Sequence, residues 1–261
     1  MQLIDIHTHI YPPAISRKAA ASIREFYQLD TREMDGTADT LLTRGAEAGI
    51  DRFVVLPVAM RPDRTRHIND FIIGQVTEQP RFLGFGSIHA GMENIAEEVE
   101  YILQNGLLGV KMHPDFQEFD IDDPRLFPAY EAMRGRLCVM LHMGDTRYSY
   151  SHPARLRRVL DNFPGLQVIA AHFGGYSMYE TAYDELRDKD CIFDVSSSMM
   201  FMERGIPEKF INIYGAERMA FGTDYPLWDP ITETKRFLQL DLTDAQFEQI
   251  GHKTAERIFK L

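Results

Sequence analysis

The sequence is poor in cysteine, and the two cysteines that it has lie in apolar surroundings. Among 261 residues, only Cys138 and Cys191 carry a thiol. Each stands in or beside an apolar run, which predicts two buried thiols and no disulfide. Such sparing use of cysteine is typical of a reducing compartment, so we expect a cytoplasmic protein.

Targeting signals, long apolar stretches and positive charge are also scarce. The first ten residues, MQLIDIHTHI, lack the basic and apolar regions of a signal peptide. No uninterrupted apolar run reaches the roughly 20 residues that a membrane-spanning helix needs. The formal net charge is -11, which disfavours nucleic acid and membrane surfaces as partners. We expect a small-molecule substrate, even an acidic one, and the sequence leaves a homodimer open.

Two further signatures are missing. No glycine-rich dinucleotide fingerprint follows the first apolar run, which weakens the alternative of an open doubly wound sheet. No nucleophile elbow surrounds Ser196, Ser197 and Ser198, so serine hydrolase chemistry is not expected. Since no linker rich in proline, glycine and serine interrupts the chain, we expect a single domain over residues 1–261.

Short apolar runs recur along the whole chain, and several are apolar at consecutive positions, as in strands buried on both faces of a parallel sheet. They are LIDIHTHI from Leu3, RFVVLPVA from Arg52, FLGFGSIHA from Phe82, LLGVKMHP from Leu107, LCVMLHMGD from Leu137, QVIAAHFGG from Gln167, CIFDVSSS from Cys191 and MAFGTDYP from Met219.

Helical patterns lie between these runs. Residues 93–106 place Ile95, Val99 and Ile102 on one face, and Asn105-Gly106 supplies a helix stop. Near the C-terminus, Thr243 and Gln246 fit a capping box. Eight strand candidates alternating with helices in this length predict an α/β fold, a single-domain (β/α)8 TIM barrel. Residues 11–35 are long for a first loop, and we expect them to cover the active face.

The first apolar run carries two histidines. Because side chains alternate along a strand, His7 and His9 project from the same face and can reach one ion. Further polar residues, His142, His172 and Asp224, follow other apolar runs. The carboxyl ends of barrel strands form the active face, so these side chains predict a metal site that keeps a position for water.

These motifs carry a family resemblance. IDIHTHI, MLHMGD, AAHFGG and FGTDYP resemble the landmarks of the amidohydrolase superfamily, from Asp5 to the final helix. More narrowly they are similar to the amidohydrolase-related (amidohydrolase 2) branch that includes aminocarboxymuconate-semialdehyde decarboxylase. The resemblance implies a (β/α)8 barrel with one divalent metal on His7, His9, His142 and Asp224. It gives His172 a catalytic role, beside Asp224, in place of a ligand role.

The metal and its number stay open at this point. Zn²⁺ is the first expectation, and Mn²⁺ or Fe²⁺ also accept imidazole and carboxylate ligands. In binuclear relatives a carboxylated lysine bridges two ions, and Lys111 stands at the corresponding strand end. An unmodified Lys111 that binds substrate is the preferred interpretation. His113, Arg147 and Tyr148 are further candidates for substrate binding, since arginine holds a carboxylate at two points.

Three functions are compatible with such a site. The first is a hydrolase, in which metal-activated water attacks a C–N or C–O bond of an amide, lactone or ester of a small acid. Asp224 would then accept the water proton and pass it to the leaving group. The alternative is non-oxidative decarboxylation of a small aromatic or muconate-type acid, which would make the protein a lyase. A catalytically silent, metal-stabilised binding protein is the third.

Overall fold

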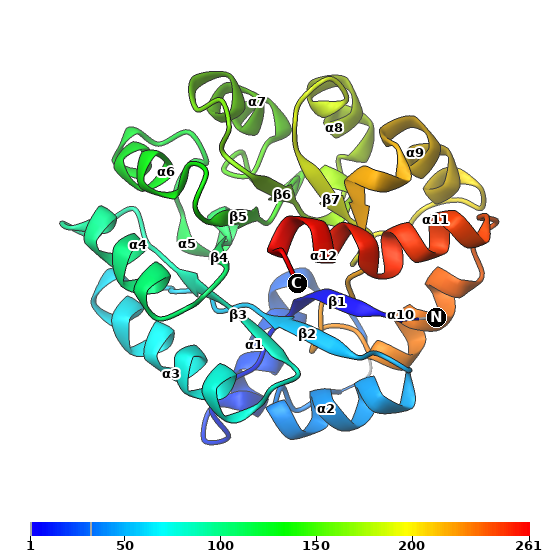
Figure 1. Cartoon of the computed structure of the whole chain (residues 1–261), viewed down its shortest axis with the longest axis horizontal. Helices are drawn as coiled ribbons and strands as arrows, with labels where there is room; N and C mark the ends of the chain where they lie inside the picture. The colour runs from blue at the N-terminus through cyan, green and yellow to red at the C-terminus, as the bar shows by residue number, and fades with distance from the viewer. Residues whose placement is uncertain (1, 32) are drawn as a thin grey trace. The chain divides into compact units, whose positions relative to one another are not determined.

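The computed structural model describes residues 2–31 and 33–261, in which short strands alternate with helices (Figure 1). The strands are β1 (Ile4–Thr8), β2 (Arg52–Val55), β3 (Phe82–Ser87), β4 (Gly109–Met112), β5 (Cys138–Leu141), β6 (Val168–Ala170), β7 (Ile192–Asp194) and β8 (Met219–Ala220). Each lies inside one of the eight apolar runs, which confirms the predicted strands.

The helices fill the segments between the strands. They are α1 (Ser16–Tyr27), α2 (Ala38–Glu47), α3 (Thr65–Glu78), α4 (Ile95–Gln104), α5 (Pro114–Gln117), α6 (Phe127–Met133), α7 (Pro153–Asn162), α8 (Tyr179–Leu186), α9 (Ile206–Tyr214), α10 (Pro230–Leu238), α11 (Asp244–Glu248) and α12 (Thr254–Phe259). The predicted capping box is present at α11, where Thr243 and Gln246 bond each other's backbone N–H. A π-helical turn, Gln249–Lys253, precedes α12.

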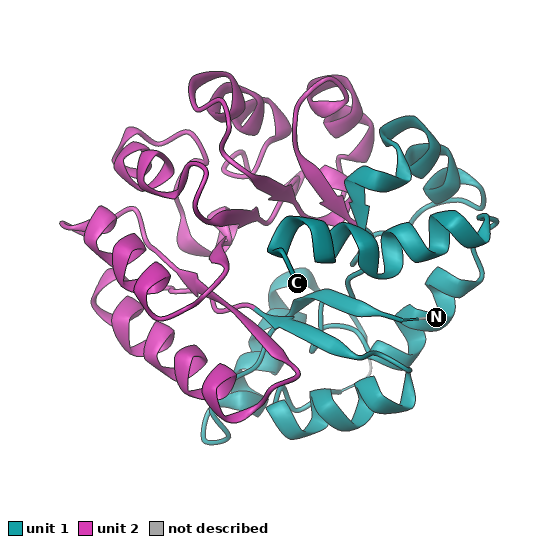
Figure 2. Cartoon of the chain, viewed as in Figure 1, with its two compact units in different colours: residues 1–55, 195–261 teal, residues 56–194 magenta. Residues whose placement is uncertain are grey.

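The strands follow chain order, from β1 to β8, in one eight-stranded sheet. Parallel strands that alternate with helices in this order form a (β/α)8 barrel, which confirms the predicted fold. Contacts divide the chain into two compact units (Figure 2). Unit 1 comprises Met1–Val55 and Val195–Leu261, with β1, β2 and β8, and unit 2 comprises Leu56–Asp194, with β3 to β7.

In unit 2, the register of the parallel strands fixes which side chains reach the carboxyl edge. Met112 of β4 pairs with Leu141 of β5, Leu141 pairs with Ala170 of β6, and Ala170 pairs with Phe193 of β7. The residues that follow these partners therefore emerge at the same edge of the sheet. They are His113, His142, Ala171 and Asp194.

In unit 1, the segment that follows β8 runs beside β1. The backbone N–H of Ile6 donates to the Phe221 carbonyl at 2.9 Å, and that of Asp224 donates to the His7 carbonyl at 2.7 Å. The His9 N–H donates to the carbonyl of Tyr225 at 2.7 Å. The two segments are thereby locked in a register that sets Asp224 beside the two predicted histidine ligands.

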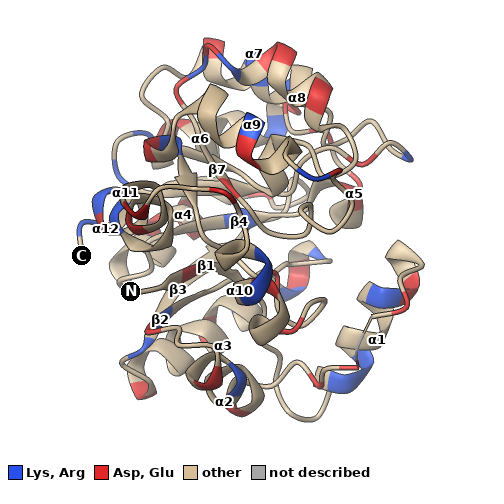
Figure 3. Cartoon of the chain, turned by 90° about the vertical axis from the view of Figure 1, so that its right-hand side faces the viewer, with Lys and Arg blue, Asp and Glu red and all other residues tan. Residues whose placement is uncertain are grey.

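Nearly all strand positions are buried, whereas charged side chains are distributed along the helices. Among strand residues, Arg52 is the one that is only partly buried. Figure 3 shows both signs of charge along helices such as α1 and α7. The apolar strands need helices to cover them, and the helices turn their charged faces to water. Across residues 2–31 and 33–261, no helix combines the length and the apolar character needed to cross a bilayer.

The segment predicted to cover the active face contains α1. This helix buries Ser16 and Ala20 and ends at Gln28, which adopts a left-handed φ of 54°. Its apolar side chains Ile23, Phe26 and Tyr27 are partly exposed. The role of residues 11–35 as a cover of the active face stays a prediction.

In unit 2, the loop after β5 approaches the loop after β6 at a pair of glycines. A Cβ on Gly144, whose φ is +73°, would lie 2.4 Å from the Cα of Gly175. Gly165 also has a positive φ, +84°, but a Cβ there would meet no atom within 4 Å. A side chain at Gly144 would therefore meet both a left-handed backbone and a steric clash, whereas one at Gly165 would meet the left-handed backbone alone.

We predict that Gly144→Ala destabilises the chain more than Gly165→Ala does. Both variants carry the strain of a left-handed alanine, and only Gly144→Ala adds a backbone clash, worth about 1–3 kcal/mol. Urea unfolding followed by circular dichroism measures the difference. Equal losses in the two variants would contradict the close packing of these loops.

Candidate metal centre and active site

Two imidazoles and one carboxylate converge in unit 1. Nε2 of His7 lies 3.5 Å from Oδ1 of Asp224, and Nε2 of His9 lies 3.4 Å from the same oxygen. The two rings are 5.2 Å apart between centroids and inclined by 64°. All three side chains belong to one group of donor atoms that lie within 4.8 Å of one another.

This donor set fits a divalent ion. Ligand atoms held about 2.1 Å from a tetrahedral ion lie about 3.4 Å from one another. The separations between the carboxylate oxygen and the two imidazole nitrogens, 3.4 and 3.5 Å, match this edge length. Imidazole and carboxylate together suit Zn²⁺ and Mn²⁺ alike, so the geometry leaves the choice of metal open.

Both the ring and the backbone N–H of His7 are held by polar contacts. Its Nδ1 lies 3.2 Å from Oγ of Ser196, which directs Nε2 towards Asp224. Asp5 accepts the backbone N–H of His7 and also the hydroxyl of Thr223, at 3.1 and 2.6 Å. Asp5 therefore ties β1 to the segment after β8, although it is an acid close in sequence to the two candidate histidine ligands.

Gly222 makes the close approach at His7 possible. A Cβ at this position would lie 2.9 Å from the Cβ of His7. Any larger residue here would push the imidazole away from its place beside Asp224. The glycine of the FGTDYP motif is therefore part of the site's construction.

Asp224 is held through its second oxygen. The hydroxyl of Ser197 donates a hydrogen bond to Asp224 Oδ2. Trp228 in turn donates its indole N–H to Oγ of Ser197 at 2.8 Å. Oδ1 faces the two imidazoles, so the two oxygens of one carboxylate have different environments.

Several residues around the strand ends adopt the left-handed backbone region without being glycine. These residues are Asp224 and Ser197 in unit 1, with φ of 61° and 52°, and His172 and Phe173 in unit 2, with φ of 61° and 55°. Each such conformation costs roughly 1–2 kcal/mol, and such strain is typical of functional sites. All four lie within the segments that the sequence singles out as strand ends.

In unit 2, His142 and His172 lie next to each other as their strand ends predict. Nδ1 of His142 lies 3.0 Å from Nε2 of His172. The backbone N–H of His172 donates to Asp194 Oδ1 at 3.0 Å, and Nδ1 of its ring lies 4.0 Å from that oxygen. The prediction that His142 shares one ion with His7, His9 and Asp224 joins residues of both units and stays a prediction.

A second group of potential metal donors, His113, Asp115 and His142, lies in unit 2. The rings of His113 and His142 are stacked, with centroids 3.9 Å apart and planes inclined by 8°. Lone pairs in the planes of parallel imidazoles run side by side and do not converge on one ion. His113 is also stacked on Phe116, at 3.8 Å, so its ring is packed between two others.

Asp115 is a buried carboxyl that the sequence reasoning missed. Its Oδ2 accepts the Ser151 hydroxyl at 2.6 Å and lies 3.7 Å from Nε2 of His142, while Oδ1 has no hydrogen-bond partner among the described residues. Burial raises the pKa of Asp115 to about 6, although the hydrogen bond from Ser151 opposes the shift.

The residues predicted to bind substrate have contrasting surroundings in unit 2. Lys111 is fully buried on β4, and His113 is 5% exposed. Arg147 forms an ion pair with Asp145 through Nε and a terminal nitrogen, which lies 2.6 Å from Oδ2. Tyr148 is 37% exposed. The role of these four residues in binding substrate stays a prediction.

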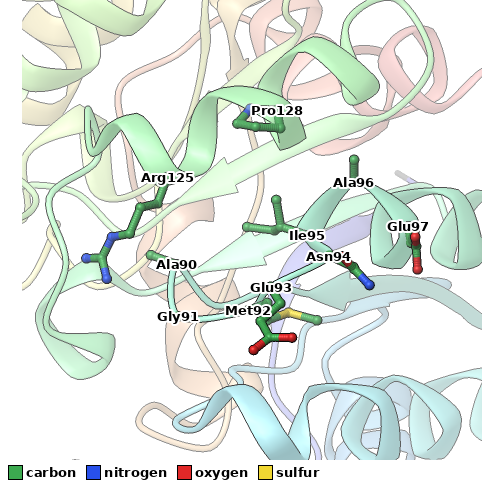
Figure 4. Close-up of a pocket in the computed structure, with 10 residues that line it drawn as sticks. All are labelled: Ala90, Gly91, Met92, Glu93, Asn94, Ile95, Ala96, Glu97, Arg125 and Pro128. Atoms are coloured by element: carbon green, nitrogen blue, oxygen red, sulfur yellow. The ribbon is translucent and has the colours of Figure 1, made fainter.

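A surface pocket of about 540 Å³ lies in unit 2 beside the loop after β3 (Figure 4). Glu93 and Glu97 line it together with Arg125, whose guanidinium is paired with Asp123. None of the predicted site residues lines this pocket. It is therefore not part of the candidate metal centre.

Comparison with known proteins bears on the whole chain. A family model described as Amidohydrolase matches residues 4–261. A 2-amino-3-carboxymuconate-6-semialdehyde decarboxylase from Dictyostelium discoideum is 26% identical over 205 residues, which is 63% of this chain and 56% of the relative. The match thus spans little more than half the length of that curated relative.

Solved structures are similar over the full chain. An uncharacterised TIM-barrel protein from Bordetella bronchiseptica has a TM-score of 0.83 at 22% identity, covering 100% of this chain and 99% of that one. A dihydroxybenzoic acid decarboxylase from Polaromonas sp. JS666, with bound manganese and the inhibitor 2-nitroresorcinol, has a TM-score of 0.78 at 19% identity, covering 100% and 97%. At these identities the likeness concerns the fold.

We predict that the purified chain binds one divalent ion and that His9→Asn weakens this binding roughly 100-fold or more. Loss of a direct ligand should exceed the ~10–100-fold cost of losing an outer contact. Metal analysis after dialysis against Zn²⁺ or Mn²⁺ measures both quantities, with the exposed His67→Asn on α3 as control. Two ions per chain would instead support the carboxylated Lys111 alternative.

Glu233 on α10 is a buried carboxyl. Burial raises the pKa of this carboxyl from 4.5 to about 7, although Arg236 opposes the shift. The folded chain therefore keeps its proton to higher pH than the unfolded chain, and this contribution to stability is lost as pH rises through about 7.

We expect Glu233→Gln to gain stability relative to the wild type as pH rises from 4.5 to 8, by at most about 3 kcal/mol. Urea unfolding across this range tests the expectation. The exposed Glu97→Gln on α4 is the matched control. A difference between Glu233→Gln and the wild type that does not change with pH would count against the raised pKa.

Proposed function

The chain belongs to the amidohydrolase family, and we propose that within it the protein is a metal-dependent decarboxylase of a small aromatic or muconate-type acid. The observation that carries the proposal is that both oxygens of the Asp224 carboxylate already have partners. Hydrolysis needs this carboxylate to accept a proton from metal-bound water. Its second oxygen already accepts the Ser197 hydroxyl and its first faces the two imidazoles, so the carboxylate is arranged to hold an ion rather than to take a proton from water.

The relatives support the same choice. The curated relative is named a decarboxylase of a carboxymuconate semialdehyde, and the Polaromonas structure is named a dihydroxybenzoic acid decarboxylase. From the sequence, a hydrolase is the first expectation and a decarboxylase the alternative. These relatives favour the decarboxylase. Manganese in the Polaromonas protein makes Mn²⁺ as good an expectation as Zn²⁺ for this chain.

A divalent ion on His7, His9 and Asp224, with His142 as the fourth expected ligand, would bind the oxygens of the acid and stabilise negative charge. The chain's own residues have the remaining tasks. Asp224 holds its place as a ligand, since both of its oxygens are engaged.

Loss of carbon dioxide leaves the electron pair of the broken C–C bond on the substrate carbon, which must then take up one proton. We assign the delivery of this proton to His172. Its ring nitrogen Nε2 already shares a hydrogen bond with His142, and its backbone N–H is fixed by Asp194. An imidazole can hold a proton and pass it on, which suits general acid catalysis.

The assay that tests the function is a panel of acids and esters. With Mn²⁺ or Zn²⁺ present, dihydroxybenzoates, carboxyvanillate and carboxymuconate-type acids are expected to release carbon dioxide, while lactones and amides are left intact. Opening of a lactone without release of carbon dioxide would overturn the proposal in favour of hydrolysis.

We further predict that His172→Asn lowers kcat at least ~100-fold, the usual contribution of general acid–base catalysis, and leaves the metal content unchanged. Asparagine tolerates the left-handed φ at this position, so folding should survive the change. His67→Asn is the matched control on the surface. A His172→Asn variant with full turnover would remove His172 from the mechanism.

A further inference from the structure

Three consecutive serines follow β7, and each has a different relation to the candidate ligands of unit 1. Ser196 contacts Nδ1 of His7, and Ser197 donates to Oδ2 of Asp224. The hydroxyl of Ser198 is buried and has no hydrogen-bond partner within the described part of the chain. Two adjacent serines thus contact two candidate ligands through their hydroxyls, and the hydroxyl of the next serine has no hydrogen-bond partner among the described residues.

The direction of the hydrogen bonds at Ser197 is fixed by chemistry. The indole N–H of Trp228 can only donate, and it points to Oγ of Ser197 at 2.8 Å. A carboxylate oxygen can only accept, so the single hydroxyl proton of Ser197 must go to Asp224 Oδ2. The chain of hydrogen bonds from Trp228 through Ser197 to the Asp224 carboxylate therefore has one polarity.

This chain of bonds acts on the orientation of the carboxylate. With Oδ2 held by Ser197, rotation about the side chain is restricted, and Oδ1 stays 3.4–3.5 Å from the two imidazole nitrogens. Ser197 and Asp224 both have left-handed backbones, with φ of 52° and 61°. Such conformations persist only where the surroundings hold them.

We infer that Ser197 is a positioning residue for the metal centre, which it preorganises by fixing Asp224, and that Trp228 fixes Ser197 in turn. The inference rests on the proposed metal site but not on the proposed substrate. It gives Ser197 a task unrelated to a serine nucleophile. It also makes Trp228, the only tryptophan in the sequence, an optical reporter of the site.

The test measures Zn²⁺ affinity of the full chain by competition with a chromophoric chelator, without any substrate. Ser197→Ala and Ser197→Gly should weaken binding about 10–100-fold, the range for loss of an outer-shell hydrogen bond to a ligand. Glycine is favoured at a positive φ, so Ser197→Gly relieves the left-handed strain and offsets part of the stability lost with the two hydrogen bonds, and its unfolding temperature shows that the variant is folded. Trp228→Phe should weaken binding in the same direction by a smaller factor.

Ser198→Ala is the matched control, because it removes a buried serine hydroxyl one residue away that has no partner in the described chain. It should bind Zn²⁺ as the wild type does. The emission of Trp228 should change on saturation with Zn²⁺ in the wild type and in Ser198→Ala. The change should be smaller in Ser197→Gly at equal saturation.

Wild-type Zn²⁺ affinity in a folded Ser197→Gly variant would overturn the inference, as would equal losses in the Ser197 and Ser198 variants. The outcome is independent of the decarboxylase proposal. If no acid releases carbon dioxide and the affinities follow the expected order, the function is wrong and the positioning role stands. If carbon dioxide is released and Ser197→Gly binds Zn²⁺ normally, the function stands and the positioning role is wrong.

Discussion

Two backbone hydrogen bonds underlie the candidate site. They join the segment that contains β1 to the segment that follows β8. The N–H of Asp224 donates to the carbonyl of His7 at 2.7 Å, and the His9 N–H donates to Tyr225 at the same distance. These two bonds set the register in which two imidazoles and one carboxylate face one another. Gly222 allows the approach, since a Cβ there would lie 2.9 Å from that of His7.

Burial is the second constraint, because each polar side chain near the strand ends must find partners in place of water. Two buried acids of unit 1, Asp5 and Asp224, meet it in different ways. Asp5 bonds the hydroxyl and the backbone of Thr223, and so joins two segments of the fold. Asp224 gives one oxygen to Ser197 and turns the other to the imidazoles. Two carboxylates near the same strand end thereby have a structural role and a chemical role.

The same ligand set is compatible with hydrolysis and with decarboxylation, so the choice depends on the atoms behind the ligands. A carboxylate with a free oxygen can take a proton from water, whereas one with both oxygens engaged is better suited to hold an ion. The Trp228–Ser197 pair therefore bears on the reaction although neither residue belongs to the predicted ligands. In unit 2, His113 is held by ring stacking between Phe116 and His142, so its closeness to another histidine has a structural explanation without a shared metal.

The sequence by itself determined the strands, the fold and which polar residues stand at strand ends. Alternating side chains put His7 and His9 on one face, and apolar runs place His142, His172 and Asp224 at their ends, because these patterns depend on local periodicity. It also predicted the capping box at Thr243 and Gln246, which is a local motif as well.

Only the tertiary structure decided what surrounds these residues. The roles of Ser197, Trp228 and Asp115 depend on partners distant in the sequence and on left-handed backbones that no local pattern encodes. In the sequence, Ser197 stands out only as a polar residue at a strand end. The absence of a nucleophile elbow argues against a role as a nucleophile, and no other local pattern indicates a different role. A hydroxyl can donate to any acceptor nearby, so its role depends on which acceptor the fold brings beside it. The sequence shows that the hydroxyl is present, but only the tertiary structure identifies its acceptor.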